Sequence, residues 1–400
     1  MQRGASRLAI SIDLDAKTNR GSFSAPDLGA LDIPLSSLRL DPAIHWELVG
    51  DSTTTTFDMM AQAKVMRGTF RENAGSGTVL LNRVSDSTAK PYTLAEMTFM
   101  NGNVHLAGTL YVPRSGGTHP AVVLVHGSGA EGRWATAYIA DYLARHGIIA
   151  LAYDKRGVGA STGDWRTATM QDLVDDARAA VHALSQRPDV DRKRVGVYGH
   201  SQGAEIAPAI ALNNPEVTWL GAADGPVGPQ YKQDLFRVDT ALQQRYSGAD
   251  LIEAERVYAE FVDAARNGTP REQLRADMQT YANSAWLADL AIPGDDNWIW
   301  AWYRGAGNYD NSQDWAGVKV PVLILFGADD KLVPVQESIV ETTRILKDNG
   351  NADVWVRVFP EADHTLRIPP STSEGWPHNA PGFLETLARF AKNLRLSSRT

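Results

Sequence analysis

The chain lacks cysteine altogether, which excludes disulfides, thiolate metal sites and a cysteine nucleophile. This absence does not identify the redox compartment, because cysteine-free proteins occur in reducing and oxidising surroundings alike. The chain also has no run of about 18 apolar residues, so no transmembrane helix is expected. Positions 1–12 lack the basic and then apolar pattern of a signal peptide. As written, the chain is therefore expected to be cytoplasmic.

The sequence has no excess of basic residues. Its 39 Lys and Arg are outnumbered by 47 Asp and Glu, which gives a formal net charge of −8. No broad basic field can neutralise phosphates or an anionic membrane surface, so nucleic-acid and membrane partners are not expected. The hydrophobic fraction of 43% and the charged fraction of 22% are ordinary for a globular protein. A length of 400 residues suits one large domain with insertions, or two or three units.

Positions 1–90 contain short β runs separated by turn residues, and this pattern predicts a small all-β domain. The runs are Leu8–Asp13, Trp46–Val49, Thr55–Met60, Lys64–Thr69 and Thr78–Arg83. The domain lacks the aromatic-glycine opening that such domains often show, as if a leader and a first strand preceded it. A longer precursor would make the protein periplasmic or secreted.

Positions 91–225 and 316–400 predict one catalytic domain. A hairpin with an Asn101-Gly102 turn comes first, and apolar β runs then alternate with amphipathic helices such as Met170–Leu184. This alternation is typical of a mostly parallel sheet with helices on both faces. Its expected strands are Ala121–Val125, Ile148–Tyr153, Arg194–Tyr198, Val217–Leu220, Val320–Phe326 and Val354–Val358.

Positions 226–315 interrupt the alternation and predict a helical cap insertion. Helical segments follow one another there without a strand, namely Gln233–Tyr246, Asp250–Arg266 and Pro270–Leu290. The insertion leaves the sheet after one predicted strand and rejoins it before the Asp330 strand, so it should lie above the side of the sheet to which Ser201 points. An aromatic stretch near its end suggests apolar pocket walls and contains Trp286, Trp298, Trp300, Trp302, Tyr303 and Tyr309.

A serine framed by glycines follows one of the predicted strands. Residues 199–203 read Gly-His-Ser-Gln-Gly and lead into the small-residue helical stretch Ala204–Leu212. A nucleophile elbow needs this strand, turn and helix, because side chains two residues from the serine would collide with neighbouring backbone. The bland interpretation of Ser201 is a helix-capping serine. The context favours a nucleophile instead.

An acid and a base for Ser201 follow in chain order. A serine hydroxyl needs a base to remove its proton and a carboxylate to orient that base. Asp330 comes at the carboxyl end of the predicted strand Val320–Phe326, and His364 lies on the loop after the next strand. Asp329 is the alternative acid. His378 is the weaker alternative base, because it lies in a loop rich in Pro, Ser and Asn.

Ser201, Asp330 and His364, in this order, resemble the α/β-hydrolase superfamily over about residues 92–395. Residues 126–129 (His-Gly-Ser-Gly) and 153–161 (Tyr-Asp-Lys-Arg-Gly-Val-Gly-Ala-Ser) resemble a bacterial carboxylesterase subgroup that carries a β domain before the catalytic domain. This subgroup is related to prolyl-oligopeptidase-like hydrolases. The family's Gly-x-x-Asp-x-x-Val-Pro spacing favours Asp330 over Asp329.

The resemblance implies a fold and a site. The fold class is α/β: the mostly parallel α/β-hydrolase sheet with helices on both faces, a helical cap insertion and a small N-terminal all-β domain. The site would combine a Ser201–His364–Asp330 triad with an oxyanion hole from the backbone N–H groups of Gln202 and Ser128, and Gly129 is a further candidate donor. Ala204 departs from the family, which often has a second glycine there, so we expect tighter helix packing without loss of chemistry.

Other charged and histidine residues near these motifs have plainer interpretations. His126 and His200 could be metal ligands, but no carboxylate or further histidine stands at ligand spacing, so structural roles are expected. The charged turn 154–156 is expected to support its loop. No cofactor and no metal is required.

The expected function is hydrolysis of small-molecule carboxylic esters of short to medium acyl chains through an acyl-enzyme. The alternatives are a serine peptidase or amidase of prolyl-oligopeptidase-like type, or a thioesterase. A distant alternative is a dinucleotide-binding oxidoreductase, since residues 127–132 match Gly-x-Gly-x-x-Gly with Asp154 about 20 residues later. That interpretation leaves Ser201, Asp330 and His364 unexplained. A third class of function is a binding protein with a hydrolase fold that has no catalytic activity. The sequence does not indicate the oligomeric state.

Overall fold

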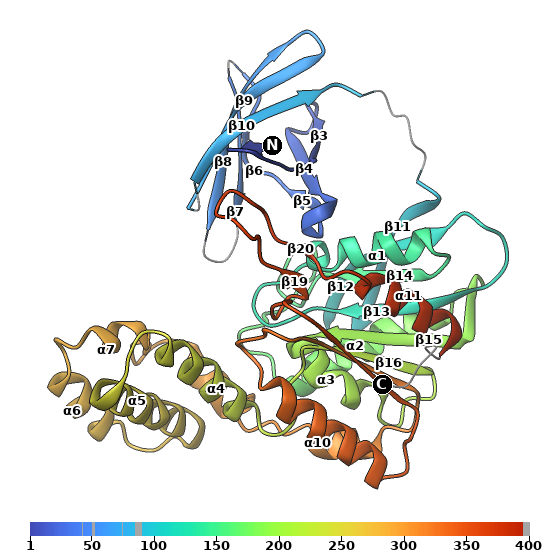
Figure 1. The fold of residues 1–400 in the computed structure, drawn as a ribbon. Helices are drawn as coiled ribbons and strands as arrows, with labels where there is room; N and C mark the ends of the chain where they lie inside the picture. Colours follow the sequence, from blue (N-terminus) through green and yellow to red (C-terminus); the bar gives the residue numbers. More distant parts are fainter. Residues whose placement is uncertain (42, 50–52, 74, 85–89, 395–400) are drawn as a thin grey trace.

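A computed structural model describes residues 1–41, 43–49, 53–73, 75–84 and 90–394. An all-β region lies at the top of Figure 1, an α/β region lies below it, and a group of helices extends to the left of the α/β region. The last positions of the predicted catalytic domain, 395–400, lie outside the described residues.

The N-terminal region contains two antiparallel sheets, ordered β2-β1-β10-β9-β8-β7-β6 and β3-β4-β5. Trp46, Phe57 and Phe70 are buried at its centre, where Trp46 stacks on Phe57 with ring centroids 5.1 Å apart. The strands are β1 (Gln2–Arg3), β2 (Ser6–Arg7), β3 (Ser11–Asp15), β4 (Arg20–Ala25), β5 (Ala30–Pro34), β6 (Ser36–Arg39), β7 (Ile44–Val49), β8 (Thr54–Gln62), β9 (Val65–Glu72) and β10 (Gly75–Asn82).

The prediction of a single strand over Leu8–Asp13 is wrong in its bounds. The N–H of Leu8 donates to the carbonyl of Met1 in the first hairpin, and β3 starts only at Ser11. Strands β4 and β6 were not predicted, because both are rich in serine and lack a clear alternation of apolar residues.

The α/β region is built on an eight-stranded sheet with the order β11-β12-β14-β13-β15-β16-β17-β18. The six strands from β14 to β18 in this order are parallel, and β11 and β12 form the antiparallel edge. The predicted hairpin turn is confirmed, because Asn101 pairs with Val104 and Gly102 has a φ of 54°. The strands are β11 (Tyr92–Asn101), β12 (Val104–Pro113), β13 (His119–Val125), β14 (Ile149–Tyr153), β15 (Val190–His200), β16 (Trp219–Ala223), β17 (Val322–Gly327) and β18 (Val354–Phe359).

Helices cover both faces of this sheet, which confirms the predicted fold class. Alternate residues of β13 face opposite sides, so Val123 packs in one apolar cluster and Val122 in the other. The first cluster contains side chains of α2 (Met170–Ser185), α3 (Gln202–Ala211) and α10 (Val335–Asp348). The second contains those of α1 (Ala137–Arg145) and α11 (Phe383–Asn393). Strand β16 lies two residues later than predicted, because the N–H of Val217 is used in a turn with Asn214.

The segment 226–315 is helical throughout its regular elements. Its helices are α4 (Gln230–Gln243), α5 (Gly248–Asn267), α6 (Glu272–Thr280), α7 (Ala285–Asp289), α8 (Ile299–Gly305) and α9 (Ser312–Gly317), and the last of these runs past the segment's predicted end. The single helix predicted over Pro270–Leu290 is wrong. A turn in which Ser284 N–H donates to the Tyr281 carbonyl separates α6 from α7, as expected for serine, whose side chain competes with helical backbone bonding.

A C-terminal loop connects the α/β region to the all-β region. It contains the short strands β19 (Arg367–Ile368) and β20 (His378–Asn379). Trp376 packs against Phe70 with ring centroids 6.3 Å apart, and Arg3 donates from Nε to the carbonyl of Glu374 at 3.2 Å. The two regions therefore share a structured interface, which the sequence did not indicate.

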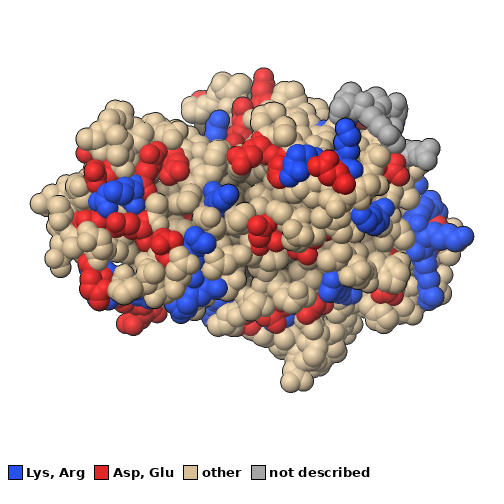
Figure 2. Space-filling view, turned by 90° about the horizontal axis from the view of Figure 1, so that it is seen from below, with Lys and Arg blue, Asp and Glu red and all other residues tan. Residues whose placement is uncertain are grey.

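The surface carries charges of both signs. In Figure 2, acidic and basic side chains are interspersed over the face that is shown. This distribution agrees with the sequence, which has no broad excess of positive charge. Among the described residues, no helix combines the length and the apolar character needed to cross a bilayer.

Candidate active site

Ser201 lies at the sharp turn between β15 and α3. Its backbone has φ 52° and ψ −119°, a conformation that a residue with a side chain rarely adopts. A Cβ atom at Gly199 would lie 2.1 Å from the carbonyl oxygen of Gly203, and one at Gly203 would lie 2.4 Å from that of Val125. Both glycines are therefore needed for the close approach of backbones at the turn, as the sequence predicted.

The structure brings Ser201, His364 and Asp330 into one hydrogen-bonded chain. His364 Nε2 lies 2.9 Å from Ser201 Oγ, and His364 Nδ1 lies 2.7 Å from Asp330 Oδ2. Asp330 Oδ1 accepts hydrogen bonds from the backbone N–H groups of Leu332 at 2.7 Å and Val333 at 3.1 Å. The Asp330 side chain is fully buried. A fixed carboxylate thus orients the imidazole toward the serine hydroxyl.

The alternative acid and base lie elsewhere. Asp329 is exposed, and its N–H donates to the carbonyl of Ala362. His378 is exposed on β20. Neither residue has a hydrogen bond to Ser201 or His364 within the described part of the chain, so the geometry favours Asp330 and His364.

Two further ionisable groups, Asp224 and the partly buried His200, lie behind this chain. Asp224 directly follows β16, and its Oδ1 accepts the N–H of Gly327 at 2.8 Å. Burial, strengthened by the negative charge of Asp330, raises the pKa of Asp224 well above its ordinary value and favours its neutral form. His200 Nε2 donates to the carbonyl of His364 at 2.7 Å. Burial, together with nearby His364, lowers the pKa of His200 to about 4, so its ring is neutral.

Among the described residues, one group of side chains could offer ligand atoms to a cation. Ligand atoms of Asp224, Asp330 and His364 lie within 4.8 Å of one another. Hydrogen bonds account for the closeness of Asp330 and His364, because His364 bridges Asp330 and Ser201.

His126 is buried against Tyr153, with ring centroids 4.8 Å apart, and burial lowers the pKa of His126 well below the ordinary value. These contacts fit the structural roles expected for the two motif histidines.

The predicted oxyanion donors lie beside Ser201. Gln202 is the first residue of α3, so its N–H has no acceptor within the helix. The loop with Ser128 passes close by, since a Cβ at Gly127 would lie 3.5 Å from Ser201 Cβ. Ser128 and Gln202 both line the cavity above Ser201. Their assignment as oxyanion donors stays a prediction.

Lys155 braces this loop from behind. Its Nζ donates to the carbonyl oxygens of Gly127 and Gly129, the latter at 3.0 Å, and to Gln202 Oε1 at 3.2 Å. In a trans peptide the C=O and N–H point in opposite directions, so holding the Gly127 carbonyl turns the Ser128 N–H away from Lys155. Lys155 is only 2% exposed, and burial lowers its pKa to about 8.

The three residues of the charged turn 154–156 have different roles, and the sequence did not indicate this difference. Asp154 accepts the N–H groups of Arg133 at 2.8 Å and Ala160 at 3.0 Å, and Arg156 binds Asp176 at 2.7 Å. These two residues support their loop, as expected. Lys155 instead contacts the site, and nothing in its local pattern distinguishes it from a solvated lysine. The bonds of Asp154 also occupy the carboxylate that a dinucleotide site would need for a ribose.

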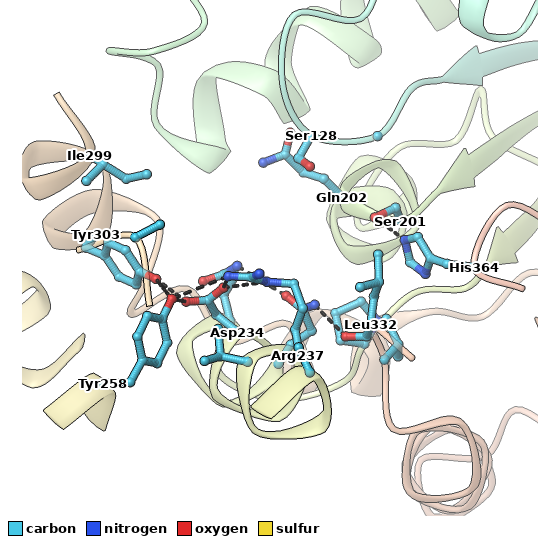
Figure 3. Close-up of a pocket in the computed structure, with 18 of the residues that line it drawn as sticks. Ser128, Ser201, Gln202, Asp234, Arg237, Tyr258, Ile299, Tyr303, Leu332 and His364 are labelled. Atoms are coloured by element: carbon cyan, nitrogen blue, oxygen red, sulfur yellow. Dashed lines mark hydrogen bonds and ion pairs between the residues drawn. The ribbon is translucent and has the colours of Figure 1, made fainter. Parts of the chain in front are cut away.

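A cavity of about 680 Å³ lies between Ser201 and the cap helices. In Figure 3, Ser201 and His364 lie on one side, and Asp234, Arg237, Tyr258 and Tyr303 lie across from them. The cap is tied to the site at two points. Gln233 Nε2 donates to the carbonyl of Leu332 at 2.6 Å, and buried Asn311 donates to the carbonyls of Glu205 and Pro226, both at 3.0 Å.

The aromatic stretch of the cap only partly faces this cavity. Trp302 and Tyr303 line it. Trp286 and Trp300 are buried in the cap's own core, and Trp298 is partly exposed beside Trp165. The expectation of apolar pocket walls therefore holds for only part of the stretch, and Trp286 and Trp300 belong to the core of the insertion. The far wall also contains charged groups, because Asp234 and Arg237 form an ion pair among its apolar side chains.

The sheet and the turn at Ser201 have the arrangement of the α/β-hydrolase fold. A mostly parallel sheet carries a serine at a strained turn after one strand, an acid after a later strand and a histidine after the next. Its central segment is similar to known hydrolases. A family model described as serine aminopeptidase, S33, matches residues 116–235.

Curated relatives of the central segment include esterases. The chain is 39% identical over 113 residues to esterase EstD of Thermotoga maritima, covering 26% of this chain and 27% of that protein. It is 33% identical over 153 residues to esterase FrsA of Yersinia pestis, covering 37% of this chain and 36% of that one. The chain thus spans well under half the length of these relatives. The solved Pyrococcus furiosus esterase Pf2001 is similar with a TM-score of 0.48 and 21% identity, over 70% of this chain and 88% of that chain.

Lys155→Met should slow the reaction of Ser201 with a fluorophosphonate by about tenfold to a hundredfold, less than the loss of an oxyanion donor itself. The reason is that the loop carbonyls lose their common anchor. In the unchanged protein the rate should fall as pH rises through about 8, where Lys155 loses its proton. In Lys155→Arg, which stays charged, this alkaline decline should move to higher pH.

The matched control for this prediction is Lys331→Met, which removes an exposed lysine near Asp330. Labelling rates are followed by intact-mass analysis across pH. Equal rates in Lys155→Met, Lys331→Met and the unchanged protein would contradict the bracing role.

Proposed function

We propose that this protein hydrolyses carboxylic esters of short to medium acyl chains through an acyl-enzyme. The observation that carries the proposal is the continuous hydrogen-bonded chain from Ser201 through His364 to Asp330 at the base of a cavity. The esterase names of EstD and FrsA support the same reaction class.

In the proposed reaction, His364 takes the proton of Ser201 as its oxygen attacks the ester carbonyl. The backbone N–H groups of Gln202 and Ser128 stabilise the negative charge on the carbonyl oxygen. His364 then protonates the departing alcohol, and the acyl group remains on Ser201. A water molecule, deprotonated by His364, releases the acid and restores the serine.

An ester is favoured over a peptide, although the matched family model is described as an aminopeptidase. A peptide amino terminus would need an available carboxylate. Of the aspartates that line the cavity, Asp234 is paired with Arg237 at 2.6 Å and Asp289 with Arg245 at 2.7 Å. Burial raises the pKa of Glu205 to about 8, so its carboxyl is mainly neutral near pH 7. Amide and thioester cleavage remain the alternatives to test.

The first test concerns the nucleophile. A fluorophosphonate should label Ser201 with one group per chain, because the hydrogen bond to His364 activates its hydroxyl. Intact-mass analysis should find no label in Ser201→Ala. Ser128→Ala is the control, since the proposed role of Ser128 uses only its backbone, and it should be labelled like the unchanged protein. Labelling that persists in Ser201→Ala would exclude Ser201 as the nucleophile.

The second test separates the two neighbouring acids. Asp330→Asn should lower turnover by at least about a hundredfold, because the amide favours the wrong tautomer of His364. Asp329→Asn, the exposed neighbour, should retain turnover within about twofold, as expected for a surface change. Turnover is measured with a p-nitrophenyl ester, and circular dichroism checks folding. The opposite ranking would move the acid role to Asp329.

The third test concerns substrate class and length. Specificity constants for p-nitrophenyl esters should rise with acyl length and then fall, since each buried methylene contributes about 0.8 kcal/mol until the cavity is full. Aminoacyl and dipeptidyl anilides should react far more slowly than the esters. Dominant anilide cleavage would make the protein a peptidase, and a monotonic rise to long chains would indicate an open, lipase-like site.

A further inference from the structure

The wall of the cavity that faces Ser201 contains a charged side chain that ester hydrolysis does not require. Arg237 projects from α4 into the cavity, and 41% of its side chain is exposed (Figure 3). Its Nε and Nη2 both donate to Asp234 Oδ1, at 3.0 and 2.6 Å. An apolar acyl chain gains nothing from a guanidinium at this place, so the group needs another explanation.

A buried network fixes the direction of Arg237. Asp234 is 7% exposed, and its second oxygen accepts the hydroxyl of Tyr258 at 2.7 Å and that of Tyr303. Burial and, to a lesser extent, the negative charge of Asp234 raise the pKa of both phenols. Both hydroxyls therefore keep their protons and can donate hydrogen bonds to Asp234. Because hydrogen bonds hold both oxygens of Asp234, this carboxylate can fix the Arg237 guanidinium in one orientation. Such partly buried pairs contribute little to stability, because desolvation offsets their attraction.

Part of the guanidinium is left for a ligand. Arginine has five N–H donors in a planar fork. Nε and Nη2 are engaged by Asp234 and, at 3.4 Å, by Tyr258, whereas Nη1 has no hydrogen-bond partner among the described residues. The two N–H groups of Nη1 can therefore donate charge-assisted hydrogen bonds to a carboxylate oxygen of a ligand.

The acids around the cavity do not oppose an incoming carboxylate. Asp289 is bound by Arg245 and by the hydroxyl of Tyr246. Glu205 is mainly neutral near pH 7 because burial raises its pKa to about 8. Glu131 accepts the N–H of Gly127 at 2.7 Å and lies near the charge of Lys155. Each described acid of the lining is therefore paired or neutral.

From this arrangement we propose that Arg237 forms a carboxylate-binding subsite, and that the natural substrates are esters bearing a free carboxylate. The proposal rests on the proposed esterase function and names its substrate class. Arg237 binds and takes no part in bond making: water adds its hydroxyl to the acyl carbon and its proton goes to the alcohol. The carboxylate lies on the acyl or the alcohol part, and the experiment separates these two sources.

The test compares matched esters in two pairs. For the acyl part, p-nitrophenyl hemiglutarate is compared with p-nitrophenyl pentanoate. For the alcohol part, the butyrate ester of glycolic acid is compared with propyl butyrate by pH-stat. In at least one pair the charged ester should have a specificity constant about ten- to a hundredfold higher, as a charge-assisted pair provides. The pair that shows the preference identifies the carboxylate's position.

Variants connect this preference to Arg237. Arg237→Met should abolish the ratio within the preferred pair, mainly through KM. Asp234→Asn/Arg237→Met should do the same without leaving a buried carboxylate unpaired. Arg245→Lys changes the other arginine of the described lining but keeps a positive charge beside Asp289, so it should leave the ratio unchanged. The proposal is overturned if neutral esters are preferred in both pairs, or if the ratio survives in both Arg237 variants.

Binding without chemistry distinguishes a failed subsite from a failed esterase assignment. Calorimetry with glutarate on Ser201→Ala should detect binding that Asp234→Asn/Arg237→Met lacks. Binding that depends on Arg237, with no ester cleaved and no fluorophosphonate label, would support the subsite and refute the esterase assignment. Ester hydrolysis without glutarate binding and without a charged-ester preference would refute the subsite alone.

Discussion

The left-handed backbone of Ser201 is the constraint on which the rest of the site depends. Ser201, with a φ of 52°, is the single residue between the end of β15 and the start of α3, and its side chain points away from the sheet. The strain is held by neighbouring backbone, because Ser201 N–H donates to the Ala223 carbonyl at 2.9 Å and Gly203 lies against Val125. A Cβ at Gly225 would lie 2.6 Å from that of Ala204, so this side of α3 also packs closely. Sheet and helix together fix where the hydroxyl points.

Around this turn the fold tolerates ionisable groups that ordinary packing would exclude. Burial lowers the pKa of Lys155 and raises those of Asp224 and Glu205, so each is disfavoured in its charged form. Burying such groups costs free energy, and the hydrogen bonds of Lys155 to the Gly127 and Gly129 carbonyls offset only part of that cost. The concentration of such groups near Ser201 is therefore better explained by chemistry than by folding.

The sequence predicted the elements whose signals are local. The hairpin turn at Asn101-Gly102, helix α2 and the glycines around Ser201 each follow from nearby residues, and the structure contains them. Asp330 and His364 could be named because chain order in a known superfamily supplied what local pattern could not. The sequence could not predict which side chains line the cavity or how they pair. Whether Trp286 faces a core or a pocket depends on how helices cross, and the pairing of Asp234 with Tyr303 spans 69 positions.

Helix α4 links the cap to the loop that contains Asp330. Gln233 of α4 binds the carbonyl of Leu332, whose own N–H holds Asp330 Oδ1. Arg237 follows Gln233 by four residues, so the two side chains lie on one face of α4 about one turn apart. The Asp234–Arg237 ion pair is therefore set against the loop that contains Asp330, because the same helix that carries this pair also binds the Leu332 carbonyl.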